Sequence, residues 1–338
     1  MAMTIYDISK KAGVSIATVS RVLNGSENVR PSTRKKVMDV IDKYDYTPNA
    51  FARGMGLHSL KTIGILCADS SDLFLAKAVY FLEQELQANG YESLLCCTGY
   101  NPDIKKIYLN LILSKKVDSI ILVGSHFIGF NEDENQYIKD VSTQIPIMLL
   151  NASFDHPNVY STLCDDYGTM FEAATEMIQS GITDILYLYD SKSYSGLKKL
   201  HGFCDAMKEY NIPGFEKLIH FYDGNIEHLN EVADFVARIA TKGTSFHGIM
   251  TSDDSLAIGS IKYAQKKGIR IPEELSVMGY NNSMLTNCCT PELTSVDNRL
   301  ETQTHQLVQT LLGVLAGEEM PKKSIFSGKI IKRGTTLF

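Results

Sequence analysis

From Lys61 onward the chain repeats one pattern, in which a short apolar run is followed by a stretch with apolar residues at helical spacing. Nine such runs read TIGILCA, ESLLCC, SIILVG, IPIMLL, VYSTLC, DILYLY, KLIHFY, FHGIM and LSVMGY. Strands that alternate with helices indicate parallel sheets covered by helices, because a parallel connection needs a crossover. Nine strands are too many for one lobe of ordinary size, so we expect a hinged pair of doubly wound α/β lobes.

Polar residues follow the carboxyl ends of these runs, the edge at which ligands bind in open α/β sheets. They are Asp69, Ser125, Asn151, Asp165, Asp166, Asp190, Asp223, Asp253, Asp254 and Asn281. Their carboxylate and amide oxygens accept hydrogen bonds from hydroxyl groups, which fits a polyhydroxylated ligand. The same residue types also cap helices, and we expect Asp254, which opens the helix SLAIGSIKYA, to be such a cap.

Charge divides the chain into two parts. Residues 1–61 hold ten Lys and Arg against five Asp and Glu, whereas the remaining residues hold 23 against 34. A small basic head on a larger acidic body predicts a polyanionic partner for the head only.

The head begins with two short helices. Thr4 and Asp7 have the spacing of a capping box, and the apolar residues that follow recur at helical spacing up to Gly13, a typical residue to end a helix. Ser15 then caps a second helix after a very short turn. Two helices joined by a short turn that contains Gly are the signature of a helix-turn-helix.

A third helix is predicted from about Pro31 to Tyr44, because Pro suits the first helical position and an apolar stripe follows it. Its first turns carry Arg34, Lys35 and Lys36, which either approach phosphate or are simply solvated. "YTPN" ends the helix, and the segment AFARGMGLHSL that follows is a poor helix in isolation because of Gly54 and Gly56.

The second helix has two faces. At 100° per residue Val19, Val22 and Leu23 fall together and form the buried side, while Ala17 and Arg21 point outward. Small residues with one Arg allow close approach to a groove floor, where Arg pairs with guanine and a small apolar side chain touches a thymine methyl. The alternative is an ordinary solvated helix face, and the spacing does not choose between the two.

The string TIYDISKKAGVSIATVSRVLNG…VRPSTRKKV…YTPNAFARGM resembles the DNA-binding headpiece of the lactose-repressor (LacI/GalR) family of bacterial transcription regulators, and the resemblance continues to the final KIIKRGTTLF. It implies that the second helix enters the major groove with Ile16, Ala17 and Arg21 at base-reading positions. It also implies a leucine-type wedge in the minor groove, here Met55. The positions implied to touch the DNA backbone are Tyr6, Ser15, Thr18, Asn24, Asn28, Thr33 and Asn49.

The resemblance also implies the domain organisation. Residues 1–47 correspond to the headpiece, 48–60 to a hinge helix or linker, and 61–338 to a periplasmic-binding-protein-like core that binds the effector and dimerises. The expected crossovers near residues 163, 293 and 322 give an N-lobe of about 61–163 and 293–321 and a C-lobe of about 164–292 and 322–338.

Family motifs refine the expected effector site. KKLHGF places Lys199 where an effector-binding Arg is usual, and a lysine offers one point charge in place of a planar fork. SDDSLAIG places Asp253 at a ligand-facing position, and MGYNN places Asn281 where Asp is usual. CADSSDLF keeps Asp69 and Phe74 but lacks the usual proline pair. The strand ends add Ser125 and Asn151, and the YDGNIE region offers Ile226 where some members have an aromatic residue.

Other classes of protein find little support. The chain lacks a phosphate loop, G-x-S-x-G and H-E-x-x-H, and its eight histidines are scattered, so we expect neither an enzyme nor a metal site or cofactor. The N-terminus has no apolar signal region and no run is long enough to span a membrane, so we expect a cytoplasmic protein. Seven cysteines without a C-x-x-C fit reduced, buried thiols.

We therefore expect a sequence-specific DNA-binding regulator, a repressor of carbohydrate-utilisation genes that binds a pseudo-palindromic operator as a homodimer and a sugar between its lobes. No heptad segment follows KRGTTLF, which favours a dimer over a tetramer. The sign of control stays open between inducer and corepressor. The alternatives are a sugar-binding receptor without a DNA role, and a regulator that responds to a nucleobase or a phosphocarrier protein.

Overall fold

The computed structural model of the chain describes residues 3–23, 26, 28–46, 60–241 and 243–338. They divide into two units, of which the first is Met1–Thr62 with Lys116–Asp118 and the second is Ile63–Lys115 with Ser119–Phe338. The expected hinge, with Gly54 and Met55, lies outside the described residues, as do Asn24 and Asn49.

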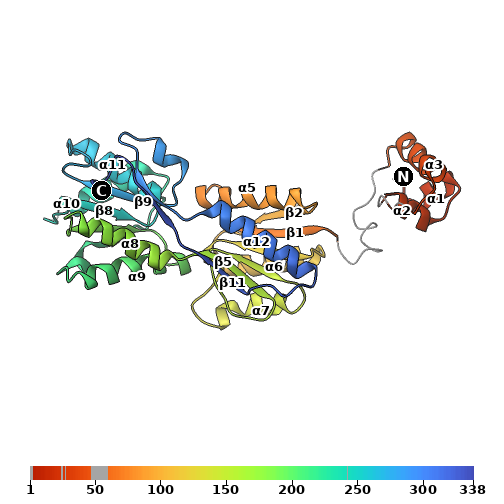
Figure 1. Ribbon diagram of the computed structural model, residues 1–338, viewed down its shortest axis with the longest axis horizontal. Helices are drawn as coiled ribbons and strands as arrows, with labels where there is room; N and C mark the ends of the chain where they lie inside the picture. Colours follow the sequence, from red (N-terminus) through yellow and green to blue (C-terminus); the bar gives the residue numbers. More distant parts are fainter. Residues whose placement is uncertain (1–2, 24–25, 27, 47–59, 242) are drawn as a thin grey trace. The chain divides into compact units, whose positions relative to one another are not determined.

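Three helices form the head, α1 (Ile5–Ala12), α2 (Ile16–Leu23) and α3 (Pro31–Lys43), labelled in Figure 1. The predicted capping box is present, because the Thr4 hydroxyl accepts from the Asp7 amide while the Asp7 carboxylate accepts from the Thr4 amide. Gly13 ends α1 at φ 65°, a conformation that favours glycine. The head has a small core of its own, made of Ile8, Val19, Val22, Val29, Val37, Ile41 and Tyr46.

Two six-stranded sheets form the second unit, which confirms the two-lobed α/β fold. The N-lobe sheet has the order β11-β5-β4-β3-β1-β2. Its strands are β1 (Thr62–Cys67), β2 (Glu92–Cys97), β3 (Ser119–Val123), β4 (Ile147–Leu150), β5 (Val159–Cys164) and β11 (Lys323–Phe326). Its helices are α5 (Leu73–Ala88), α6 (Pro102–Ser114), α7 (Gln136–Ser142) and α12 (Leu300–Leu315).

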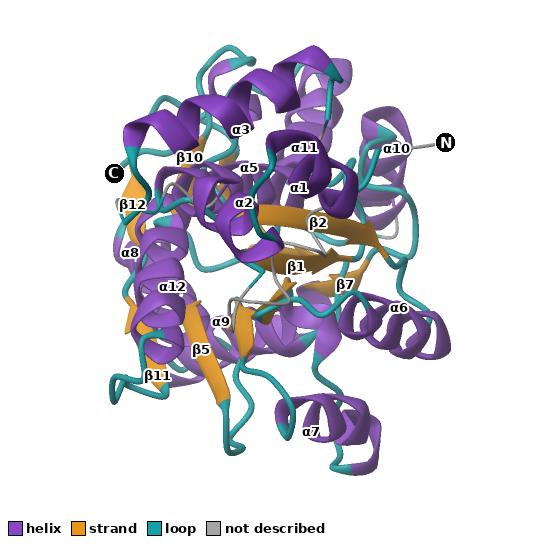
Figure 2. Cartoon of the chain, turned by 90° about the vertical axis from the view of Figure 1, so that its right-hand side faces the viewer, coloured by secondary structure: helices purple, strands orange, loops and turns teal. Residues whose placement is uncertain are grey.

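The C-lobe repeats this plan with the order β12-β10-β9-β8-β6-β7. Its strands are β6 (Ile185–Tyr189), β7 (Ile219–Phe221), β8 (Gly248–Thr251), β9 (Ser276–Tyr280), β10 (Thr294–Asp297) and β12 (Lys329–Ile331). Its helices are α8 (Asp166–Gln179), α9 (Tyr194–Glu209), α10 (Leu229–Thr241) and α11 (Asp254–Lys267). In the N-lobe, α12 runs beside β5 in both views (Figure 1 and Figure 2).

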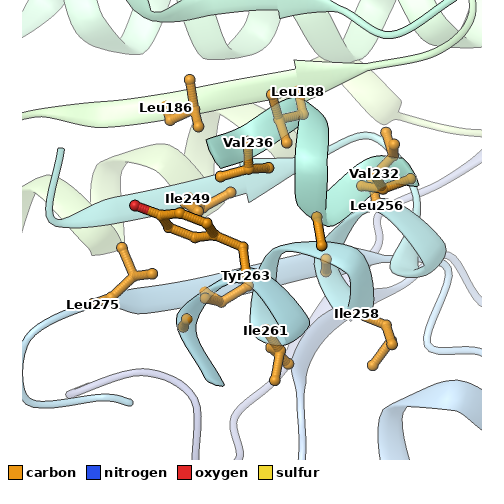
Figure 3. Packing of buried hydrophobic residues seen from close by; sticks show 14 of the residues in the cluster. Leu186, Leu188, Val232, Val236, Ile249, Leu256, Ile258, Ile261, Tyr263 and Leu275 are labelled. Atoms are coloured by element: carbon orange, nitrogen blue, oxygen red, sulfur yellow. The ribbon is translucent and has the colours of Figure 1, made fainter. Parts of the chain in front are cut away.

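The inner strands of both sheets are buried on both faces, which explains why they read as continuous apolar runs, whereas the edge strand β2 is largely exposed. Residues of α10 and α11 cover one face of the C-lobe sheet, where Val236 and Tyr263 lie near Leu186 and Ile249 (Figure 3). Residues of α8 and α9 cover the other face around Phe203. In the N-lobe, α5 and α12 pack on one face of the sheet.

All nine predicted strands are present, but the structure adds β10, β11 and β12. These three are short, and β12 is antiparallel to β10, so the C-lobe sheet is not purely parallel. The chain changes lobe after β5, between β10 and α12, and between β11 and β12. Strands β10 and β11 therefore each complete a sheet before the chain changes lobe.

The seven cysteines are free, as expected, but they are not uniformly buried. Cys67 and Cys164 are buried, whereas Cys97 and Cys288 are exposed. Among the described helices, none combines the length and the apolar character needed to cross a membrane.

Candidate functional site

The outward face of α2 is formed by the residues that were predicted to read bases. Val19 and Val22 are buried in the head core, whereas Ile16 is 39% exposed and Ala17 and Arg21 are also exposed. Arg21 forms no ion pair with any described residue. The guanidinium is thus available to a ligand outside the head.

The predicted backbone-contact residues surround this face to different degrees. Tyr6 is 67% exposed and Asn28 is exposed, while Thr33 is partly buried. The Ser15 hydroxyl caps α2 by accepting from the Thr18 amide, at 3.2 Å, and lies 2.9 Å from the Thr18 hydroxyl. These two hydroxyls are therefore occupied within the head unless DNA displaces one bond.

In the second unit, the order of the strands in each sheet predicts where a ligand binds. The order reverses between β1 and β3 in the N-lobe and between β6 and β8 in the C-lobe. Loops that leave neighbouring strands in opposite directions open a crevice at such a switch point. A cavity of about 570 Å³ lies where the two crevices face each other, and this volume is typical of small-molecule sites, at roughly 300–1,000 Å³.

The N-lobe wall of this cavity comes from the loops after β1, β2 and β3. Asp69 accepts two bonds of 2.8 Å from the amide and hydroxyl of Ser71, and these bonds lower the pKa of the Asp69 carboxyl. Asp72 caps α5 through the Leu75 amide, yet burial and the neighbouring carboxylates raise its pKa. Tyr100 lies edge-on to the ring of His126, with 4.8 Å between the ring centroids.

The C-lobe wall comes mainly from the loops after β6, β7 and β8. Asp190 accepts from the Ser252 hydroxyl at 2.8 Å. Asp253 accepts from the Ser255 amide and from the Asn281 side-chain amide, both at 2.8 Å. Burial, together with the charges of Asp190 and Asp254, raises the pKa of Asp253 to about 7.

A smaller pocket continues inward from this cavity and contains Lys199. The Lys199 ammonium is buried, donates to the Ser252 carbonyl at 3.0 Å and lies 3.9 Å from the ring centroid of Tyr280. The buried Asp166 nearby accepts from the hydroxyls of Ser195 and Tyr280. Burial raises the pKa of Asp166, and the charge of Lys199 opposes that increase.

Two hydrogen bonds link the lobes directly beside the cavity. The Ser125 hydroxyl donates to the Ser193 hydroxyl at 2.8 Å, and the Ser191 hydroxyl lies 3.4 Å from Nε2 of His126. Ser193 is also the N-cap of α9. The start of α9 therefore follows any change in the spacing of the lobes.

The seven residues that the sequence assigned to the effector site come together around the two connected pockets. Asp69 and Asp253 line the large cavity, and the inner pocket is lined by Phe74, Ser125, Asn151, Lys199, Asp253 and Asn281. Their contact with an effector stays a prediction. Asn281 makes both of its amide bonds inside the protein, to Asp253 and from Asn298, so it orients Asp253.

Some strand-end residues have other roles. Asp165 caps α8, and Asp223 lies outside the large cavity. The prediction that Asp254 caps α11 is wrong. Asp253 is the N-cap of α11, and Asp254 is the first helical residue. The Asp254 carboxylate instead accepts from the Ser283 amide and the Ser295 hydroxyl. The reversal arises because β8 ends at Thr251, which leaves Asp253 extended.

Sequence reasoning missed several residues that line the cavity, among them Asp72, Tyr100, His126 and Ser191. Each of these four lies one to three residues beyond the first polar residue after its strand. A signal existed for Asp72, because it precedes the apolar helical pattern LFLAKAV as an N-cap does. Within the described residues, no three His, Cys, Asp or Glu converge as a metal site would require.

Comparison with known proteins supplies the family. The model for bacterial regulatory proteins of the lacI family matches residues 4–49, and that for a periplasmic binding protein-like domain matches residues 174–336. An HTH-type transcriptional regulator of Lachnoclostridium phytofermentans is 49% identical over 99% of this chain and 100% of its own length.

Solved structures agree on the fold. The Lac repressor dimer bound to operator and an anti-inducer has a TM-score of 0.88 at 20% identity and covers 100% of both chains. The CelR–cellobiose complex has a TM-score of 0.71 at 20% identity and covers 98% of this chain and 99% of its own. This chain belongs to the lacI family of bacterial regulatory proteins, and it is a transcriptional regulator that binds DNA through its N-terminal helix-turn-helix.

Proposed function

We propose that this regulator represses carbohydrate-utilisation genes in the cytoplasm, and that a small polyhydroxylated ligand in the cleft between its lobes sets its affinity for operator DNA. A homodimer would present two α2 helices to the two halves of a pseudo-palindromic site. The Lac repressor of known structure is a dimer bound to its operator, which supports this arrangement.

The cleft is the observation that carries the proposal. Its walls come from the switch points of two different sheets, and the lobes touch across it through Ser125 and Ser193. A ligand that contacts both walls binds one spacing of the lobes better than another and thereby shifts their equilibrium. Residues 48–60 connect the head to the lobes that form the cleft. We therefore infer that a change in lobe spacing affects DNA binding by the head through this segment of the chain.

The cleft also favours a ligand rich in hydroxyl groups over a nucleobase. Its polar groups are carboxylates, hydroxyls and amides, which suit hydroxyl partners. CelR, which shares the fold, is known in complex with cellobiose. A receptor without a DNA role does not account for the head, and the relatives of this chain are regulators and not enzymes.

A thermal-unfolding screen tests the proposal directly. Monosaccharides, disaccharides, sugar phosphates and nucleobases would be added to the full chain, and each ligand that raises Tm would then be tested for its effect on operator binding. A ligand at a hundred times its Kd stabilises the protein by about 2.7 kcal/mol. We expect a sugar to raise Tm and to change operator affinity.

Two variants make the screen specific to the cleft. Asp190→Asn removes a charge from the cavity wall and should reduce the shift. Asp223→Asn, at a strand end outside the cavity, is the matched control and should respond as the parent does. A nucleobase that is active while every sugar is silent would contradict the carbohydrate proposal.

A further inference from the structure

We propose that the effector is an amino sugar, which presents a protonated amino group to the carboxylates of the cleft. This inference rests on the proposed function, because it names the ligand class of the same cavity. It does not follow from the fold, since CelR, which shares the fold, is known in complex with the neutral sugar cellobiose, and it depends on the charges of this chain.

The charge of the cavity lining is entirely of one sign. Five carboxylates line it, and none of the other described lining residues is Lys or Arg. The five are Asp69, Asp72, Asp190, Glu227 and Asp253. None of them takes part in an ion pair recorded among the described residues. Asp69, Asp72, Asp190 and Asp253 are partly buried and Glu227 is exposed, and a cation in the cavity is attracted by all five.

The hydrogen bonds that hold these side chains come from neutral donors. Asp69 accepts from Ser71, Asp72 from the Leu75 amide and Asp190 from the Ser252 hydroxyl, in each case on Oδ1. These bonds orient the carboxylates without neutralising them. Asp69 and Asp72 are oriented further by the backbone amides of Asp72 and Phe74, and Asp190 keeps its second oxygen for a donor inside the cavity.

The carboxylates also repel one another. Asp190 and Asp69 both raise the pKa of Asp72, and Asp190 is the largest charge contribution to the raised pKa of Asp253. Groups on both lobes therefore feel a single negative field. A cation bound between them relieves the repulsion, and it does so only while the lobes face each other.

The nearby basic groups do not offset this field. Burial and the charge of Lys105 lower the pKa of His126 to about 4, so its ring is neutral near pH 7. The Lys105 ammonium donates to the His126 carbonyl, on the inner side of that loop. Lys199 donates to the Ser252 carbonyl, and its charge acts on the buried Asp166 and Asp254.

The geometry favours an organic cation over a metal ion. In the described part of the chain, no three acidic, His or Cys side chains meet as an ion would require, so the negative charge is spread along the cavity. The lining also includes the hydroxyls of Ser71, Ser191 and Ser255 and the side-chain amide of Asn225. The Tyr100 ring, whose residue is 50% exposed, adds a face on which a cation binds. A lining that combines hydroxyl partners with carboxylates matches a sugar that carries an amine.

Matched ligand pairs test the inference on the full chain. Binding of glucosamine, galactosamine and the glucosamine disaccharide would be measured by titration calorimetry at pH 7.5, each beside its N-acetylated and its hydroxyl counterpart. We expect at least one amine to bind tenfold or more tightly than both counterparts, and its advantage to shrink as salt is raised. The N-acetyl compound has a larger substituent than a hydroxyl at the same position but carries no positive charge, so it distinguishes an effect of charge from an effect of size.

Two variants then test whether the amino group of the ligand binds the carboxylates of the cavity. Asp72→Asn and Asp190→Asn should each weaken binding of the amine by more than binding of its neutral counterparts and so remove most of the preference, while the fold is kept because Asn also caps α5 and still accepts from Ser252. Asp223→Asn is the control and should keep the preference.

The outcomes separate this inference from the proposed function. Equal or tighter binding of a neutral sugar overturns the amino-sugar inference and leaves the proposed function standing. A preference for amines that survives both cavity variants also overturns it, as does binding of spermidine without binding of any amino sugar. Failure of every sugar in both screens would overturn the two proposals together.

Discussion

Arg21 is the residue on which direct reading of DNA sequence most depends. It is exposed on α2, opposite Val19 and Val22, and has no ion pair within the described head. The small residue Ala17 lies on the same outward face, which lets the helix approach the bases closely.

We expect Arg21→Ala to weaken binding to the operator by about 1–3 kcal/mol and to relax base preference at one position of each half-site. Fluorescence anisotropy with operator and with random DNA would measure both. Lys35→Ala, on the exposed face of α3, is the control for loss of charge. An equal loss on both DNAs for Arg21→Ala would contradict base reading.

Asp253 combines a helix cap with a place in the cavity wall, and burial raises its pKa to about 7. In the unfolded chain the same carboxyl ionises near pH 4. Its contribution to stability is therefore complete below about pH 4 and is lost as pH rises through 7, because the folded state binds the proton more tightly. Asp254, with a pKa of about 6, acts in the same direction.

The expected result is a Tm that falls between pH 5 and pH 8 without ligand, by less in Asp253→Asn than in the parent chain. Asn is a good helix cap, so α11 should survive the change. Scanning calorimetry measures Tm across this pH range. The comparison uses the slope of Tm against pH, so a constant difference in Tm between the variant and the parent does not affect it. Parallel curves for the two proteins would refute the role given to Asp253.

At the scale of elements, the motif KKLHGF fits the packing of α8 against α9. Gly202 faces α8 so closely that a Cβ there would lie 2.3 Å from the Tyr167 carbonyl oxygen. The next residue, Phe203, is fully buried and stacks on Tyr187 with 4.6 Å between the ring centroids. Glycine therefore lets the two helices approach, and Phe joins them to the sheet.

Gly202→Ala should destabilise the C-lobe by about 1–3 kcal/mol, since the backbone of α8 must move to admit a methyl group. The neighbouring His201 is exposed, and His201→Ala is the control that should leave stability nearly unchanged. Urea unfolding followed by circular dichroism compares the two. An unchanged midpoint for Gly202→Ala would show that the helices yield without cost.

Elements differed in how far the sequence predicted them. The inner strands were evident because burial on both faces selects continuous apolar runs, and the edge strands β2 and β7 were evident because ESLLCC and KLIHFY are rich in apolar residues although neither strand is fully buried. Strands β10, β11 and β12 were missed because each is short and the exposed residues of β11 and β12 carry little apolar signal. Their positions depend on the sheets they complete, and sequence spacing does not show this.

At the scale of the whole molecule, the proposed coupling between effector and operator must be reciprocal. If the effector changes operator affinity by some factor, operator DNA changes effector affinity by the same factor. Effector titrations with and without saturating operator measure one factor, and operator titrations with and without effector measure the other. Unequal factors would indicate a third linked equilibrium, such as a change in dimerisation.

By itself, the sequence determined the class of fold, the helix-turn-helix and the strand ends that border the cleft. Those features depend on local causes, namely apolar periodicity, helix caps and the switch from strand to loop. Asp69 and Asp253 were found in this way, although they lie on different lobes.

Only the tertiary structure decided how these residues act together. It brought Asp72, Asp190 and Tyr100 to one cavity, moved the expected helix cap from Asp254 to Asp253, and directed Lys199 to a backbone carbonyl. The reason is physical. Charge repulsion, burial and pairing depend on distances between segments far apart in the chain, and those distances are set by the packing of two sheets and the chain crossings between them.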